Sequence, residues 1–196
     1  MFVPRLTACL TSVALAVAPP LAAQSVPGAL YTVVVPTGQF GSSAYLTHVL
    51  QGLAAARAFC TALNDPSLNI DCLAERLSDL SDAVPEDSDY AEVRSVLNDA
   101  STQLSDLARA NRDSTRGRVT ATQPGPEPGT VLAQTSRPLV PVSPAALPGV
   151  NRDAVAILDE AETVLLRSAE ASSDKRTQYT RIADAIDSNK VLLRST

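Results

Sequence analysis

The fold is decided by residues 59–73, which read FCTALNDPSLNIDCL. In the middle of this stretch, residues 64–66 (NDP) form a stop signal, because Asn and Asp favour turns and proline cannot continue a helix. On both sides of the stop, apolar residues recur every three or four positions, which is the spacing of a buried helical face. The stretch therefore predicts a helical hairpin, with one helix ending at about Leu63 and the next beginning at Asn69 or Asp71.

Two cysteines lie at the joined ends of these helices. Cys60 falls in the last turn of the first helix and Cys72 in the first turn of the second. An even number of cysteines in an oxidising compartment favours a disulfide. The alternative, a redox-active pair, has the spacing C-x-x-C, whereas eleven residues separate these two. We therefore predict a structural disulfide, Cys60–Cys72, that clamps the hairpin.

The oxidising compartment is itself predicted by the start of the chain. Arg5 is followed by an apolar stretch over residues 8–18 and then by small residues up to Ala23. This order is typical of a secretory signal peptide over residues 1–23, with which Cys9 would be removed. The apolar run is too short for a membrane-spanning helix. We expect an extracytoplasmic protein, periplasmic or secreted, with no stable membrane anchor after cleavage.

Residues 43–113 are predicted to form a three-helix segment around the hairpin. The serines at positions 42–43 cap the first helix, and Pro85 ends the second. A third helix opens at Asp89, with Glu92 three residues later as in a capping box, and its apolar residues follow a heptad-like spacing.

Residues 114–150 hold seven of the fourteen prolines of the chain. Their length and proline content predict a semi-extended, partly disordered linker. Two short apolar stretches within it, residues 131–132 and 139–140, are able to dock on another surface.

Residues 24–42 are predicted to form a short extended arm. The β-branched stretch at residues 30–35 (LYTVVV) has the composition of a strand, and a lone strand needs a partner. Residues 130–142 are the only other stretch that favours a strand, so a pairing between the two is one alternative.

Residues 151–196 are predicted to be a C-terminal helical segment that packs on the first three helices. Asn151 is placed to cap it, and two rows of residues spaced by seven follow: Leu158, Leu165, Ser172, Tyr179, Ile186 and Leu193, with Ala154, Ala161, Ser168, Lys175, Ile182 and Asn189. One long helix would have a polar middle. Usual helix lengths favour two helices, or one kinked helix, with a turn at residues 172–174.

The predicted fold is therefore mostly α. We expect an antiparallel helical bundle of four to five helices, with the disulfide-clamped hairpin, the Pro-rich linker and the extended N-terminal arm.

Composition narrows the range of partners. The formal net charge is −5, and the chain has three Phe, four Tyr and no Trp. Nucleic acids and anionic lipids need a basic surface, so neither is expected as the main partner. The one local basic tract, Arg109, Arg112, Arg116 and Arg118, is where an acidic partner would be sought.

Residues for catalysis or metal binding are scarce. His48 is the only histidine, and no carboxylate lies three or four residues from it to orient the ring. The acidic residues at 86–92 lack the glycine and the third acid of a calcium loop, and those at 159–162 lack the aromatic neighbours of a sugar site. We predict no catalytic, cofactor or metal site, and no enzyme. An exported hydrolase would need His48 to meet Ser or carboxylates from distant segments.

The functional prediction follows from two features of the sequence: its helices have long apolar faces, and catalytic groups are scarce. We expect an exported, non-enzymatic protein that acts by helix-to-helix contact, with another protein in cell-envelope assembly or by self-association. The predicted contact face is Tyr179, Ile182, Ile186 and Leu193. The alternative is a carrier of a small apolar ligand, held in a cavity inside the bundle.

Overall fold

The computed structural model describes residues 43–194, with the exception of residues 87, 128, 170 and 171. All of the described residues belong to one structural unit, residues 33–196. The predicted signal peptide, the predicted arm and the strand expected at residues 30–35 lie outside the described residues.

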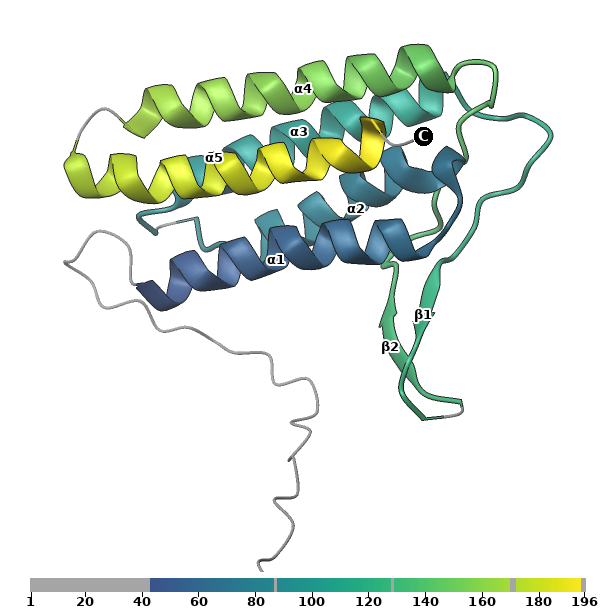
Figure 1. The fold of residues 1–196 in the computed structure, drawn as a ribbon, viewed down its shortest axis with the longest axis horizontal. Helices are drawn as coiled ribbons and strands as arrows, with labels where there is room; N and C mark the ends of the chain where they lie inside the picture. The colour runs from purple at the N-terminus through teal and green to yellow at the C-terminus, as the bar shows by residue number, and fades with distance from the viewer. Residues whose placement is uncertain (1–42, 87, 128, 170–171, 195–196) are drawn as a thin grey trace, which may run out of the picture. The chain divides into compact units, whose positions relative to one another are not determined.

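Five helices form an antiparallel bundle, which confirms the predicted fold class (Figure 1). They are α1 (Ser43–Ala62), α2 (Asn69–Asp82), α3 (Ala91–Ala110), α4 (Leu147–Ser168) and α5 (Ser173–Arg194), with a short 3-10 helix, η1 (Pro66–Leu68), before α2. Each helix packs against the next along the chain, and α5 closes the ring against α1. Because the number of helices is odd, α5 and α1 run in the same direction (Figure 1).

The C-terminal segment is two helices that lie side by side. α4 ends at Ser168 and α5 begins at Ser173, so the break falls just before most of the predicted turn at residues 172–174. Most members of the seven-residue rows are buried, whereas Ser172 is exposed. The start of α4 differs from the prediction: the helix begins at Leu147, one turn before Asn151, with Pro148 in its first turn. Proline is well suited to that place, because the N–H that it lacks has no partner within the helix.

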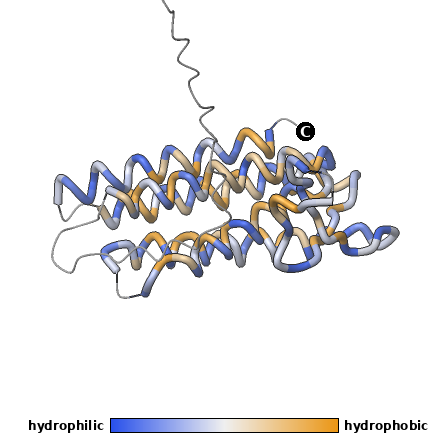
Figure 2. The backbone as a smooth tube through the Cα atoms, turned by 90° about the horizontal axis from the view of Figure 1, so that it is seen from below, coloured by the Kyte–Doolittle hydropathy of each residue, from blue (hydrophilic) through white to orange (hydrophobic). Residues whose placement is uncertain are grey.

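The core consists of the apolar faces that the helical spacing predicted. Hydrophobic and hydrophilic residues alternate along the helices (Figure 2), and one contiguous cluster of buried side chains runs through all five. Gly52 allows α1 to approach α2 closely: a Cβ at this position would lie 2.5 Å from a methyl carbon of Leu80. Gly52 thus serves packing.

The disulfide between Cys60 and Cys72 is present, with a Cα–Cα distance of 5.8 Å. It lies in a second apolar cluster at the end of the bundle where α1 meets α2. Leu139 and Ala121, from the segment predicted to be a linker, complete this cluster. The bridge therefore supports the hairpin and the surface on which the following segment packs.

Residues 114–150, predicted to be a semi-extended, partly disordered Pro-rich linker, do join α3 to α4, but most of this segment is folded and packs on the bundle. Residues 112–142 fold back on themselves as a β-ribbon. Its strands β1 (Thr122–Pro124) and β2 (Val131–Gln134) pair antiparallel, and isolated bridges join Val119 to Leu139 and Arg112 to Val142. The described partner of β2 is β1, and the alternative pairing with residues 30–35 involves a segment outside the described residues. Three buried apolar residues, Leu139, Val140 and Val142, fix the returning half of the ribbon to the bundle.

The start of α3 also differs from the expected capping box. Its N-cap residue is Tyr90, which makes no side-chain cap, and the backbone N–H of Tyr90 bonds to the hydroxyl of Ser88. Glu92 instead reaches α5, where it accepts hydrogen bonds from Lys175 and from the hydroxyl of Tyr179. Within residues 43–194 as described, none of the helices has the length and apolar character needed to cross a membrane.

Candidate functional site

The predicted contact face lies inside the bundle. Tyr179, Ile182, Ile186 and Leu193 are all buried, and they pack in the main core cluster. Their seven-residue spacing correctly marks a buried face, but the residues that bury it belong to the same chain. A partner would reach these side chains only if the bundle opened, so this assignment is corrected.

The exposed apolar residues point to a different surface. Among the described residues, the large hydrophobic side chains that remain exposed are Val131, Leu132, Val164, Leu166 and Val191. Leu132, with 64% of its surface exposed, and Val131, with 56%, are neighbours on β2. The β1–β2 hairpin that carries them extends away from the helices at one end of the bundle (Figure 1).

Each strand of the hairpin has one feature that hinders the addition of a further strand at its end. β1 ends in Pro124, which Pro126 follows two positions later, and proline has no N–H to offer an added strand. On β2, the carbonyl of Gln134 already accepts a hydrogen bond from Arg76 of α2, at 3.1 Å. The hairpin therefore presents side chains rather than a free strand edge.

Asp71 of α2 holds the base of the hairpin. Its carboxylate, which is fully buried, accepts two hydrogen bonds from the guanidinium of Arg137, at 2.7 and 2.8 Å. The backbone N–H of Val140 donates a third, at 2.7 Å. These hydrogen bonds raise the pKa of Arg137. A buried charge paired in this way fixes the position of residues 137–140 on α2.

Two further acids continue along the same face of α2, each four residues after the last. Glu75, also buried, accepts hydrogen bonds from the backbone N–H and the hydroxyl of Ser136. Asp79 accepts a third from that hydroxyl, at 3.1 Å, and its pKa is raised by burial and by the nearby charge of Glu75. We call Asp71, Glu75 and Asp79 the acidic row. It anchors the returning strand of the ribbon to the bundle.

The outgoing strand is anchored by Arg116. Its guanidinium donates hydrogen bonds to the carboxylate of Asp65, at 2.7 Å, and to the hydroxyl of Ser67, at 2.6 Å. The hydrogen bond from Arg116 lowers the pKa of Asp65. One member of the predicted basic tract is therefore structural.

The opposite end of the bundle contains three buried tyrosines. The rings of Tyr45 and Tyr90 have centroids 4.6 Å apart, and those of Tyr90 and Tyr179 are 6.3 Å apart. Burial raises the pKa of Tyr90 to about 12, and it also raises the pKa of Tyr45 and of Tyr179. His48 lies beside Tyr45, half-buried, with ring centroids 6.3 Å apart. Within the described part of the chain it forms no hydrogen bond or ion pair.

Lys190 of α5 is a buried cation between α4 and α5. Its ammonium lies 2.5 Å from Asp159, 2.7 Å from Glu162 and 2.7 Å from Asp187. Burial disfavours the charged form, but the three carboxylates together raise the pKa of Lys190. Asp159 and Glu162 lie in the middle of α4 rather than near its start, and their role here is to join two helices.

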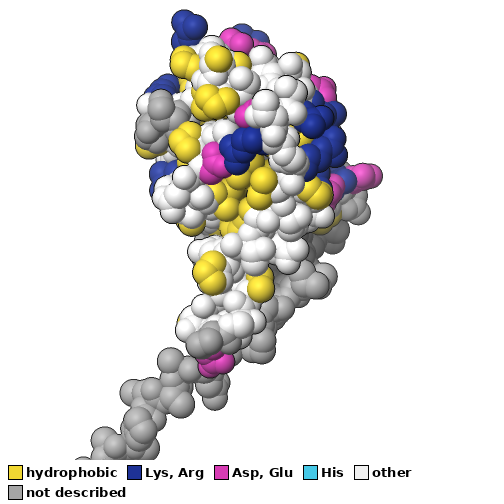
Figure 3. All heavy atoms as spheres, turned by 90° about the vertical axis from the view of Figure 1, so that its right-hand side faces the viewer, with side chains coloured by type: hydrophobic (Ala, Val, Ile, Leu, Met, Phe, Trp, Pro, Cys, Tyr) yellow, Lys and Arg dark blue, Asp and Glu magenta, His cyan; other side chains and the backbone are white. Residues whose placement is uncertain are grey.

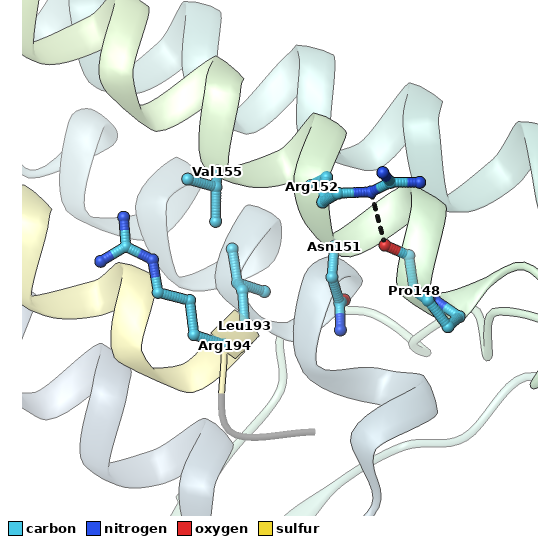
Figure 4. Close-up of a pocket in the computed structure, with 6 residues that line it drawn as sticks. All are labelled: Pro148, Asn151, Arg152, Val155, Leu193 and Arg194. Carbon is cyan, nitrogen blue, oxygen red and sulfur yellow. Dashed lines mark hydrogen bonds between the residues drawn. The ribbon is translucent and has the colours of Figure 1, made fainter.

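Four surface pockets lined by described residues are relevant to ligand binding. One, of about 360 Å³, lies where α4 begins and α5 ends (Figure 4); we call it the end pocket. Val155 and Leu193 form its apolar wall, and Arg152 and Arg194 lie on either side (Figure 4). A pocket of about 280 Å³ at the base of the ribbon is lined by three arginines. The others lie between α3 and α4 and beside the α2–α3 turn.

Across the residues that the structure describes, no group of three His, Cys, Asp or Glu side chains is arranged to hold a metal ion. No family model matches the chain, and no curated protein or solved structure is significantly similar to it. Its function is therefore inferred from its own residues and their geometry.

Proposed function

We propose that this protein is an exported, non-enzymatic binding protein, and that it contacts another protein through the side chains of the β1–β2 hairpin. The helical bundle is the rigid base of this contact. It holds the hairpin through the acidic row, Arg116 and the disulfide-supported apolar cluster.

The observation that carries this proposal is the exposure of Val131 and Leu132. Full burial of one such side chain contributes roughly 1.5–3 kcal/mol to binding or folding. In the isolated chain, Val131 and Leu132 remain exposed and do not contribute this free energy, although the ribbon that carries them is anchored by buried ion pairs. Successive side chains of a strand point to opposite faces, so a partner whose cleft enclosed the hairpin and covered both would recover about 2–4 kcal/mol.

The same geometry indicates the chemistry of the partner. Residues 119–135 carry one charged side chain, Glu127, although the protein as a whole is acidic. The central part of a protein interface is depleted in charge in the same way. Because Pro124 ends β1 and the carbonyl of Gln134 on β2 already has a partner, we expect the hairpin to insert its side chains into an apolar cleft rather than to gain a third strand.

Two features support export. Residues 1–23 have the order of charge, apolar stretch and small residues that is typical of a signal peptide. The Cys60–Cys72 disulfide is compatible with an oxidising compartment, because cytosolic thiols are kept reduced. We propose a periplasmic or secreted location and a role in assembly at the cell envelope.

The test places a photo-crosslinking residue at position 132 of the exported protein, and a control at Val191, which is also an exposed apolar position, on α5. We expect one specific cross-linked protein from position 132 and none of that product from position 191. Mass spectrometry then identifies the partner, and its affinity for the purified protein is measured.

In that measurement, Val131→Ser with Leu132→Ser should weaken binding at least about tenfold, because a large part of the buried apolar surface is lost. The matched control, Leu166→Ser with Val191→Ser, should bind like the wild type. Equal affinities for the two double variants, or no cross-link from position 132, would rule out the hairpin as the contact surface.

The second candidate function is a small-ligand carrier, which the end pocket favours. Its volume of about 360 Å³ lies within the range of roughly 300–1,000 Å³ usual for small-molecule sites. It is a surface pocket and not the cavity inside the bundle that the sequence suggested. Native mass spectrometry separates the two: a co-purifying small mass that Leu193→Ala removes would support the carrier, and a purely proteinaceous complex would support the hairpin contact.

A further inference from the structure

We infer that the three-arginine pocket at the base of the ribbon is an anion-binding site that takes a phosphoryl or sulfuryl group. We call it the arginine pocket; it is lined by Ser105, Arg109, Arg118, Arg137, Pro138 and Val140. Its arginines come from three separate parts of the chain: α3, the outgoing half of the ribbon and the returning half. The fold therefore brings them together.

Arg137 is the fixed member of the set. The guanidinium of Arg137 donates two hydrogen bonds to the carboxylate of Asp71. One of the guanidinium nitrogens also lies 3.4 Å from the hydroxyl of Ser105. Because Asp71 is fully buried, it cannot be displaced by solvent, and the guanidinium remains in one position at the pocket wall. A ligand that binds Arg137 would therefore not pay the entropy cost of fixing this side chain.

Arg118 and Arg109 are the available cations. Arg118 is exposed and, within the described part of the chain, forms no ion pair or side-chain hydrogen bond. Arg109 donates to the hydroxyl of Ser105 at 2.7 Å and pairs with Asp106 at 3.0 Å. Both partners of that ion pair are more than half exposed, so it contributes only about 0–1 kcal/mol and yields readily to a stronger anion.

Three cations of this region are paired with acids and one is not. Asp71 pairs with Arg137 and Asp106 with Arg109, and Glu75 and Asp79, the other acids beside Arg137, pair with Arg76. Among the described residues, the charge of Arg118 has no ion-pair partner at the pocket. Figure 3 views the end of the bundle that carries the ribbon and shows Lys and Arg side chains gathered along one edge. Of the predicted basic tract, Arg109 and Arg118 line the pocket, whereas Arg116 is structural and Arg112 lies outside the lining.

The geometry fits a small tetrahedral anion. Guanidinium groups present several N–H donors in a plane, and groups approaching from three segments suit an anion with three or four oxygens. The volume of about 280 Å³ is just below that of pockets that enclose drug-sized ligands. The pocket would therefore hold a phosphoryl or sulfuryl group, free or at the end of a larger molecule.

The test measures binding of inorganic phosphate and of inorganic sulfate to the purified protein by calorimetry. Each titration is run at constant ionic strength against chloride, so that screening is matched. The pocket variant, Arg109→Gln with Arg118→Gln, is compared with a charge-matched control, Arg176→Gln with Arg181→Gln, whose arginines are exposed on α5. Thermal unfolding of both variants checks that the fold is retained.

We expect saturable binding by the wild type and the control, and binding about tenfold weaker or more in the pocket variant, because two charge-assisted contacts are lost. Tighter binding of phosphate indicates a preference for a phosphoryl group, and tighter binding of sulfate indicates a preference for a sulfuryl group. No binding above chloride, or equal binding by the two variants, overturns the assignment. Because Val131 and Leu132 are unchanged throughout, failure here leaves the hairpin contact untouched.

Discussion

Cys60 and Cys72 connect two helix ends that are close along the chain. Because the bridge closes a loop of about twelve residues, the chain-entropy relation gives it a stabilising contribution of about 3 kcal/mol. The double variant Cys60→Ser with Cys72→Ser should lower the free energy of unfolding by that amount in urea denaturation. The reduced wild type is the control and should behave like the variant.

Asp71 is the residue on which the hairpin depends. Arg137→Gln leaves a buried carboxylate without its counter-charge, which costs about 3–5 kcal/mol for a fully buried pair. Arg137 is 38% exposed, so we expect a smaller loss of about 2 kcal/mol in the free energy of unfolding. Arg181→Gln is the control, and urea denaturation of the two variants measures the difference. An equal stability of both variants would contradict the anchoring role of Asp71.

These two examples show which residue contacts the sequence reveals. The disulfide was predictable because both cysteines lie at the ends of one hairpin, and a stop signal marks the turn between them. The Asp71–Arg137 pair joins positions 66 residues apart, which no local pattern relates. The acidic row did leave a signal, since acids spaced by four within an amphipathic helix lie on one face.

Among the helices, the contact between α4 and α5 depends on Lys190. Replacing it by Met leaves three carboxylates close together, and we expect a loss of about 2 kcal/mol in the free energy of unfolding at neutral pH. The loss should decrease below about pH 4, because burial raises the pKa of Glu162 above its usual value and the protonated side chain no longer needs the cation. Thermal unfolding of wild type and variant at both pH values measures this; a loss independent of pH would contradict it.

The ribbon shows why a proline-rich segment can be misread. Proline is compatible with an edge strand, such as β1, which ends in Pro124. The prolines at 124 and 126 therefore disfavour a further strand beside β1, but they do not exclude the strand itself. The decisive residues are Leu139, Val140 and Val142, whose burial depends on a surface made by distant helices. A sequence shows that these residues are apolar, but it does not show that a matching surface exists.

For the molecule as a whole, the tyrosines at one end predict a response to alkaline pH. Tyr45, Tyr90 and Tyr179 have raised pKa values in the folded chain, so the folded state retains protons that the unfolded chain loses above about pH 10. Stability should therefore fall as the pH rises above that value. Tyrosinate absorbance and helical circular dichroism should change together. Tyr45→Phe should make the decline shallower, and ionisation without loss of helix would contradict the burial.

The whole bundle also explains the error in the predicted contact face. A seven-residue apolar spacing indicates that one face of a helix is buried, and Tyr179 and Ile186 on that face are indeed buried. Which chain covers that face depends on the closure of α5 against α1, which is a property of the complete ring. The exposed surface could be identified only after the core had been assigned.

The hairpin contact and the arginine pocket both require residues 112–142 to be folded onto the bundle. Amide hydrogen exchange measures this directly. The N–H of Val140 bonds to Asp71, that of Val142 to the carbonyl of Ser67, and those of Val119 and Leu139 to each other's carbonyls. We predict that these amides exchange as slowly as those in the middle of α2 and α3, because they open only when the bundle unfolds. Exchange at the rate of an unstructured chain would show that this segment is a free linker, and neither site would then exist.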